Sequence, residues 1–470
     1  MKNFLSKVQK IFNQQKKVFI IGVPIALLCL ILGIVLLARR GGDTGPHRNQ
    51  IVLTYAHWNL GQEHDNALEI RMLQAFMDEN PHIIVDIDNH IALPWIDYLG
   101  AAATDNRLPD VFAIDDLGLA AANNWLMNLT SKAWADVDFF DMPRLVQEAV
   151  LINGVVYALP FAQDIHGYFV NRELFAALGH EPPAFGVSAD NFINAVRAAT
   201  DFNHPSISLN HTFSFVEWYP GAINPHFGFF AFDGLGFAIN SPEMLTAIQL
   251  AADIYRGGFT FYSLSAEAMR SSFPIGYDLG AFRYGQMAMF YGGAGLLDMM
   301  VNQVAFDWDF IGVPGGRSVV TLDIVGISAN TNHPEEAYLL ARWMGHGTEG
   351  NLRRLQYAQE MGIVSDMLPV TQNRQVLDAL FQIVDVPGLA SVYGAMDRAL
   401  VDGMHVLPGY MQARFSAPTG IAIPGTIHDN AGVNALMRYS IIGNMAFEAH
   451  SAHAEYIARQ QLEIAQDRLR

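Results

Sequence analysis

The sequence predicts an α/β protein with two lobes, a ligand cleft between the lobes and one N-terminal transmembrane helix preceding them. Its 470 residues exceed the size of one ordinary hydrophobic core, so two cores are expected. About half of the chain (51%) is apolar and only 16% is charged, which is typical of a packed globular protein and argues against disorder. Strand patterns alternate with helical patterns, which favours a largely parallel sheet covered by helices.

The first 49 residues are predicted to anchor the chain in a membrane. Residues 18–38 carry no charge, and at about 1.5 Å per residue they span roughly 30 Å, the thickness of the hydrocarbon layer. Residues 1–17 hold five lysines, more basic side chains than follow the apolar run, so the positive-inside rule places the N-terminus in the cytoplasm. Residues 39–49 would form a linker. We therefore expect a single-pass protein of the cell membrane, with its binding domain on the extracytoplasmic side.

A cleavable signal peptide is the alternative for the same segment. The apolar run is longer than a usual signal-peptide core, and it does not end in an obvious small-x-small cleavage site. The length therefore favours an uncleaved anchor.

Charge and cysteine content exclude several kinds of partner. The formal net charge is −18, and the first 40 residues contain only basic charged side chains, so the rest of the chain is strongly acidic. Such a domain repels nucleic acids and anionic membrane surfaces. The one cysteine, Cys29, lies in the apolar run, so the chain beyond it has no disulfide and no cysteine-based metal site. We expect a monomer without a cofactor or a metal.

The chain after the linker begins with strands and helices in alternation. Residues 51–56, 83–87 and 109–116 have strand patterns, and residues 63–79 and 95–103 between them have helical patterns. Ligands of parallel sheets lie beyond the carboxyl ends of the strands. Trp58 follows the first strand, and Asp115 and Asp116 end the third, so these side chains are expected at one common edge.

A second series of elements follows between residues 281 and 344. Residues 287–291 form a short apolar strand that ends in Gly292 and Gly293, where missing side chains let a ligand approach the backbone. Residues 307–313 alternate as a strand, and residues 324–328 form a third strand. A helix is expected after Asn332, because Pro334 and two glutamates occupy its first turn.

Several motifs in register over residues 51–470 resemble the extracellular solute-binding proteins of ABC transporters, sugar-binding type, which are similar to maltose-binding protein. Residues 154–160 match the pattern Gly-x-x-Tyr-x-Leu-Pro, and residues 285–289 match Gly-x-x-Ala-Met. Further segments continue the resemblance, namely residues 76–85, 108–111, 125–130 and 168–175.

The resemblance implies a periplasmic-binding-protein-like fold and a transport function. Lobe 1 would comprise residues 50–162 and 324–369, and lobe 2 would comprise residues 163–323 and 370–470. The protein would capture a carbohydrate by hinge closure and deliver it to the permease subunits of an ABC importer, without acting as an enzyme. The same fold also suits a polyamine, iron or a polyol phosphate, or a ligand sensor that acts on a membrane kinase.

Candidate ligand-binding residues combine aromatic rings with planar polar groups, which suit the C–H faces and the hydroxyls of a sugar. In the family, the turn after the Gly-x-x-Ala-Met strand usually offers a tryptophan, a position that Tyr291 would fill here. The predicted contacts are Trp58, Asp116, Asp164, Trp218, Tyr219, Tyr291, Gly293 and Asp323.

No catalytic motif is found in the sequence. It contains no Gly-x-Ser-x-Gly elbow, no Walker loop and no His-Glu-x-x-His helix. Adjacent Asp115 and Asp116 would point to opposite faces of a strand, and Asp307 and Asp309 lie too close together to flank a glycosidic bond. His450 and His453 lack a third ligand for a metal.

Overall fold

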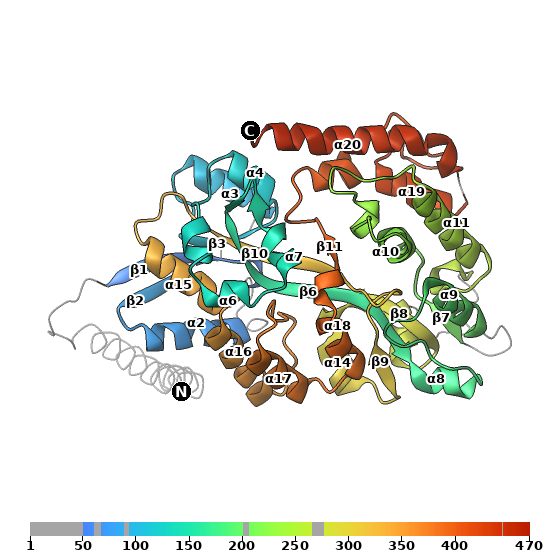
Figure 1. Ribbon diagram of the computed structural model, residues 1–470, viewed down its shortest axis with the longest axis horizontal. Coiled ribbons are helices and arrows are strands. Elements are labelled where there is room, and N and C mark those ends of the chain that lie inside the picture. The colour runs from blue at the N-terminus through green and yellow to red at the C-terminus, as the bar shows by residue number, and fades with distance from the viewer. Residues whose placement is uncertain (1–49, 61–66, 89–93, 201–205, 266–276, 444) are drawn as a thin grey trace, which may run out of the picture. The chain divides into compact units, whose positions relative to one another are not determined.

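The computed structural model describes residues 50–60, 67–88, 94–200, 206–265, 277–443 and 445–470 (Figure 1). Residues 51–470 form one compact unit. The predicted cytoplasmic segment, transmembrane helix and linker lie outside the described residues. No helix in the described part of the chain is long and apolar enough to cross a membrane.

One mixed sheet of nine strands organises the described residues. Its order is β2 (Ile83–Ile87), β1 (Ile51–Ala56), β3 (Val111–Ile114), β10 (Val319–Ile327), β6 (Ala158–Asn171), β8 (Met287–Gly293) and β7 (Ile207–Leu209). Two short strands join from the side, β9 (Trp308–Phe310) on β6 and β11 (Leu400–Asp402) on β10. A separate two-stranded hairpin comprises β4 (Leu151–Ile152) and β5 (Val155–Val156).

The prediction of a largely parallel sheet is correct only for part of it. Strand β1 is parallel to β2 and β3, and β7 is parallel to β8. Strand β10 is antiparallel to both β3 and β6, and β6 is antiparallel to β8 and β9. The sheet is mixed because the chain returns to its centre late, through β10, and not by a further strand–helix–strand crossover.

The long strands β6 and β10 connect the two ends of the sheet. The first part of β6 pairs with β10, and its last part pairs with β8 and β9. The register of β10 against β6 shifts between Asp323 and Ile324, as at a β-bulge. This irregularity falls where the sequence predicts the chain to cross between lobes, although the predicted lobe boundaries themselves stay a prediction.

Buried apolar side chains form two clusters, in agreement with the expectation of two cores. The first surrounds β1, β3 and β10 and includes Phe76 and Phe112. Its helices include α2 (Ala67–Glu79), α3 (Trp95–Thr104), α4 (Leu117–Ala122), α5 (Thr130–Ala133), α6 (Val137–Phe140), α7 (Arg144–Ala149), α15 (Pro334–Met344), α16 (Thr348–Met361), α17 (Arg374–Ile383) and α18 (Pro387–Tyr393). Helices α2, α15 and α16 pack on one another, and Pro334 starts α15 as predicted.

The second cluster surrounds Tyr168, Phe192 and Trp218. Its helices are α8 (Arg172–Ala177), α9 (Ala189–Ala198), α10 (Ser214–Ile223), α11 (Pro242–Arg256), α19 (Val433–Ile441) and α20 (Ser451–Asp467). Helices α13 (Asp278–Arg283) and α14 (Leu297–Gln303) contribute to the first cluster. Helix α20 contacts α4 as well as the segment 412–416, so the end of the chain joins the two regions (Figure 1). Short helical turns comprise η1 (Trp58–Leu60), η2 (Phe229–Ala231), η3 (Phe261–Ser263), η4 (Ala294–Leu296), η5 (Met396–Arg398), η6 (Gln412–Ser416) and η7 (Phe447–His450).

Candidate functional site

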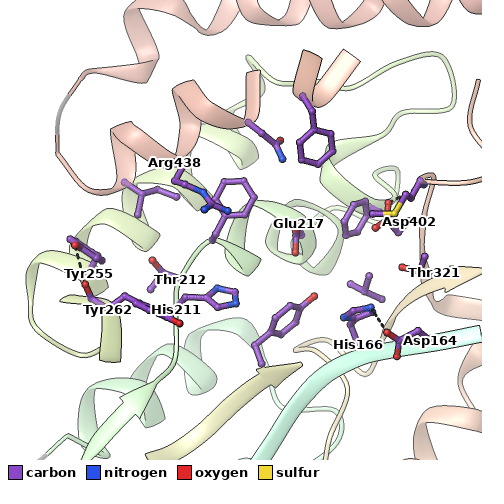
Figure 2. A pocket seen from close by; sticks show the side chains of 18 of the residues that line it. Asp164, His166, His211, Thr212, Glu217, Tyr255, Tyr262, Thr321, Asp402 and Arg438 are labelled. Atoms are coloured by element: carbon purple, nitrogen blue, oxygen red, sulfur yellow. Dashed lines mark hydrogen bonds and ion pairs between the residues drawn. The ribbon is translucent and has the colours of Figure 1, made fainter. Parts of the chain in front are cut away.

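A cavity of about 980 Å³ lies over the strands β6, β8, β10 and β11 (Figure 2). Helices α10 and α19 and the segment after β7 form its other walls. Aromatic side chains supply the apolar part of the lining, namely Phe213, Phe229, Tyr255, Tyr262, Tyr291 and Phe415. Polar side chains supply the rest, namely Asp164, His166, His211, Thr212, Glu217, Thr321, Asp323, Asp402, Asn434 and Arg438.

Four of the eight predicted contacts meet at this cavity. Asp164, Tyr291 and Asp323 line it. Gly293 lies beside Asp164, and a Cβ added to Gly293 would be 2.4 Å from an Asp164 carboxylate oxygen. The glycine was predicted to let a ligand approach the backbone, but the space beside its Cα is filled by Asp164. Gly293 therefore acts by leaving room for that carboxylate.

Trp218 and Tyr219, two more of the predicted contacts, lie elsewhere. Both belong to helix α10, most of which is buried, so the segment has no exposed polar face from which a helix is recognised in sequence. Trp218 is 0% exposed, and its Nε1 donates a hydrogen bond to the Tyr168 hydroxyl at 3.0 Å. Tyr219 is buried in the same core and does not line the cavity.

Trp58 and Asp116 lie at the edge formed by β1 and β3, also outside the cavity lining. The Trp58 ring stands edge-on to Trp95 and is tilted on His405, at 5.7 Å between centroids in both pairs. Asp116 caps helix α4, because its carboxylate accepts a hydrogen bond from the Leu119 amide at 2.9 Å. The structure therefore gives Asp116 a local role in the fold.

Asp164 and His166 form an ion pair on the floor of the cavity, with 3.0 Å between Oδ2 and Nε2. They are two residues apart in β6 and so share one face of the strand. Burial alone would raise the pKa of Asp164, but the hydrogen bond and the charge of His166 lower it below its usual value. Burial alone would lower the pKa of His166, but the hydrogen bond and the charge of Asp164 raise it above its usual value.

Asp323 is a half-buried carboxylate whose side chain is 26% exposed. Its pKa is raised to about 6, chiefly by burial; His405 opposes the rise, and the charges of Asp164 and Asp366 add to it. The His405 Nδ1 lies 3.7 Å from the carboxylate but is only 2.9 Å from the Leu322 carbonyl oxygen, its nearer acceptor. Asp323 therefore lies at the cavity with its hydrogen-bonding capacity largely unused.

Glu217 and Arg414 hold the upper wall of the cavity together. The Arg414 Nη2 donates to Glu217 Oε1 at 3.4 Å, and its Nε donates to Asn434 at 3.2 Å. Arg414 is 2% exposed, and its guanidinium lies over the rings of Phe230, at 3.9 Å, and of Phe229, Tyr410 and Phe415. Burial raises the pKa of Glu217, whereas Arg414 acts against that rise.

His211 presents a neutral imidazole to the cavity. The pKa of His211 is lowered to about 4, chiefly by burial; the charge of Asp278 opposes this fall, and that of Arg438 adds to it. Its ring meets Tyr291 edge-on at 5.8 Å, and its Nδ1 is shielded from solvent without a hydrogen-bond partner in the described part of the chain. A neutral imidazole with a free nitrogen suits a ligand hydroxyl.

Sequence reasoning missed much of this lining, including His166, His211, Glu217, Asp402 and Arg438. His166 could have been predicted from the sequence, because a polar residue two positions after Asp164 in a strand lies on the same face of that strand. Asp402 could not, since β11 is three residues long and pairs with a strand about 80 residues earlier. Within the described residues, no group of three or more His, Cys, Asp or Glu side chains is arranged to hold a metal ion.

Solved structures that share this fold include several proteins that bind sugars. One is the cyclic α-maltosyl-1,6-maltose binding protein from Arthrobacter globiformis (18% identity, 88% of this chain and 100% of that chain, TM-score 0.64). Another is the sugar-binding protein MalE from Xanthomonas citri (15% identity, 89% and 98%, TM-score 0.62). A third is an ABC substrate-binding protein from Listeria monocytogenes in complex with cycloalternan (18% identity, 89% and 98%, TM-score 0.59).

By sequence alone, no family model and no curated protein matches the chain. The structural similarity extends over nearly the full length of each of these proteins and over 88–89% of this chain. At such low identity the similarity defines the fold, and it confirms the fold class that the motifs predict for residues 51–470. The chain has the α/β periplasmic-binding-protein fold found in the sugar-binding proteins of ABC transporters.

Proposed function

We propose that this protein is the substrate-binding component of an ABC importer and that its substrate is a carbohydrate. The observation that carries the proposal is the cavity, which six aromatic rings and ten polar side chains line together. Aromatic rings pack against the C–H faces of a sugar, and carboxylates, imidazoles and hydroxyls bind its hydroxyl groups. A volume of about 980 Å³ is at the upper end for small-molecule sites, so it admits more than one sugar ring.

The proposed mechanism is closure about the long strands β6 and β10. Ligand contacts on both sides of the cleft stabilise a closed state, and that state docks to the permease. The N-terminal segment holds the protein at the outer surface of the cell membrane in this proposal. The proposal rests there on the apolar run at residues 18–38 and on the lysines that precede it.

The other ligands considered for this fold suit the side chains that line the cavity less well than a carbohydrate does. A polyol phosphate needs basic side chains, but the cavity offers one arginine, Arg438, against four carboxylates. Ferric iron needs several converging ligands, and no such group occurs in the described residues. A polyamine fits the charge, but it has no ring face to stack on the aromatic walls. A sensor for a membrane kinase would use the same cavity with another docking partner.

The test is thermal unfolding of residues 51–470 with mono- and oligosaccharides, spermidine, ferric iron and glycerol phosphate. A ligand at roughly 100 times its dissociation constant adds about 2.7 kcal/mol to the free energy of unfolding, which gives a clear shift of the midpoint. Tyr291→Ala should abolish the shift, whereas Tyr456→Ala, an exposed ring on α20, should leave it unchanged. Stabilisation by spermidine or iron without any stabilising sugar would contradict the carbohydrate assignment.

A further inference from the structure

We propose that the carbohydrate bound by this cavity carries a protonated amino group, which lies against a wall of carboxylates formed by Asp164, Glu217 and Asp402. This inference rests on the proposed function and names the class of sugar that the cavity selects. It follows from the register of three strands, from the distribution of charge between the two ends of the cavity, and from polar atoms that lack partners.

The strand register places two of the carboxylates in one row. Thr321 of β10 pairs with Asp164 of β6 on one side and with Asp402 of β11 on the other. Neighbouring strands lie about 4.8 Å apart, so the two aspartates flank the Thr321 side chain on one face of the sheet. Glu217 approaches the same region from helix α10 (Figure 2). Three carboxylates from three elements thus face one part of the cavity.

Cationic side chains of the protein compensate this wall only in part. His166 pairs with Asp164, and Arg414 pairs with Glu217. Asp402 is 8% exposed, and its carboxylate accepts a hydrogen bond from the Met404 amide at 3.2 Å, but no ion pair of Asp402 occurs in the described part of the chain. A buried carboxylate without a cation is costly, and a ligand ammonium group would supply the missing charge.

The opposite end of the cavity has the opposite sign. Arg438 lies away from the carboxylates in Figure 2, is exposed, and has its guanidinium 5.3 Å from the Phe213 ring. Its charge is therefore screened by water, whereas Glu217 and Asp402 are largely shielded from it. Among the described residues of the lining, a sugar acid would find one arginine, at the solvent, and would meet repulsion at the acidic wall. A cationic group would be attracted to that wall.

The cavity also has uncharged polar side chains, which suit the hydroxyl groups of a sugar and would not be needed for a simple amine. The free Nδ1 of His211 and the Thr212 and Asn434 side chains suit hydroxyl groups. The centroid of the Tyr291 ring lies 6.3 Å from that of His166, the partner of Asp164. Burial raises the pKa of Tyr291, and the nearby Glu217, Tyr168, Asp402 and Asp164 raise it further. An aromatic face beside carboxylates accommodates an ammonium group on a ring-shaped ligand through a cation–π contact.

The test compares ligands that differ in one substituent. Cellobiose, its 2-amino analogue (the glucosamine dimer) and the N-acetylated dimer share one linkage, and glucose and galactose with their amino and N-acetylamino forms extend the set. Calorimetry on residues 51–470 at about pH 6.5, below the pKa of about 8 typical of such amines, should give at least about tenfold tighter binding for the amino form. Equal or tighter binding of the hydroxy, N-acetyl or uronic acid forms would overturn the proposal.

Two substitutions separate the wall from the rest of the cavity. Asp402→Asn should reduce affinity for the amino sugar about tenfold and leave affinity for the matched neutral sugar within about twofold. Asp323 lines the same cavity outside this wall, so Asp323→Asn gives a second variant and should lower affinity for the amino sugar less than Asp402→Asn does. Glu463→Gln, an exposed carboxylate on α20, should change neither affinity.

The outcomes distinguish this inference from the proposed function. If a neutral sugar binds best and Asp402→Asn has no selective effect, the carbohydrate receptor stands and the amino-sugar inference fails. If spermidine binds and no sugar does, both fail. Both the proposed function and this inference also fail if none of these compounds binds.

Discussion

Asp323 makes the stability of the protein depend on pH. Its pKa is raised to about 6 by burial and by neighbouring carboxylates, whereas an aspartate in the unfolded chain has a pKa of about 3.9. The folded state therefore holds the Asp323 proton more tightly than the unfolded state. This contribution to stability is present below about pH 4 and is lost as the pH rises through about 6.

The first prediction is that Asp323→Asn stabilises the protein at about pH 7.5. The free energy of unfolding should rise by about 1 to 3 kcal/mol relative to the unmodified protein, since each pKa unit corresponds to about 1.4 kcal/mol. The difference should shrink towards zero at about pH 4, where both side chains are neutral. Urea unfolding at the two pH values measures it, and Asp86→Asn on the exposed face of β2 is the control. A uniform effect at both pH values would show that Asp323 is not the titrating group.

Among the residues of the cavity wall, Arg414 is the one whose replacement should lower the free energy of unfolding most. Its guanidinium is buried under four rings and holds Glu217 and Asn434. Arg414→Met should lower the free energy of unfolding by about 3 to 5 kcal/mol, because Glu217 is then left as a buried, unpaired charge. Adding Glu217→Gln to that variant should recover part of the loss, which urea unfolding of the two single variants and the double variant measures. Additive losses would mean that the pair is not coupled.

At the scale of elements, the contact between β8 and β6 fixes the position of the Asp164 carboxylate. His166 pairs with Gly293 in the register, and a Cβ at Gly293 would overlap Asp164. Gly295, two residues on, faces open space, with its nearest neighbouring atom at 4.0 Å from an added Cβ. A substitution at Gly295 is therefore a matched control for the same substitution at Gly293.

The third prediction concerns this pair of glycines. Gly293→Ala should weaken binding of whichever ligand the thermal screen identifies by about tenfold or more, because it displaces Asp164 and breaks its ion pair with His166. Gly295→Ala should bind that ligand normally. Isothermal titration calorimetry measures both affinities, and circular dichroism checks that both variants are folded. Normal affinity in Gly293→Ala would show that Asp164 does not touch the ligand.

The elements themselves were predictable to different extents. The strands predicted at residues 51–56 and 83–87 match β1 and β2, because short runs rich in β-branched and aromatic residues are a strong signal for a strand. Residues 307–313 were predicted as one strand, but only Trp308–Phe310 pair with β6, and a left-handed Gly312 then turns the chain. Strand β10 begins at Val319, earlier than predicted, since its first residues pair with β11, a partner distant in sequence.

At the scale of the whole molecule, the fold was predictable and most of the cavity was not. Periodic patterns and family-like motifs extend over long windows, so they identify the α/β class even where single elements are wrong. The cavity instead depends on side chains such as His211, Asp402 and Arg438, which long-range pairing and helix packing bring together. Trp218 shows the opposite kind of error, because this aromatic side chain was predicted to contact the sugar but lies buried in the hydrophobic core.

The fourth prediction tests whether the two regions of the fold respond together to a ligand. Trp58 lies outside the cavity, but its ring contacts His405, which approaches the cavity residue Asp323 to 3.7 Å. If closure moves the β1 edge relative to the cavity, the surroundings of the Trp58 ring change, and the stabilising ligand should alter the tryptophan fluorescence. Trp58→Phe should remove most of that change while the protein still binds. Trp134→Phe, a ring that is 42% exposed and packs on Phe139 and Phe140, should retain it. An unchanged fluorescence response in Trp58→Phe would mean that the β1 edge does not take part in closure, and the hinge mechanism would have to be replaced by binding to a preformed cavity.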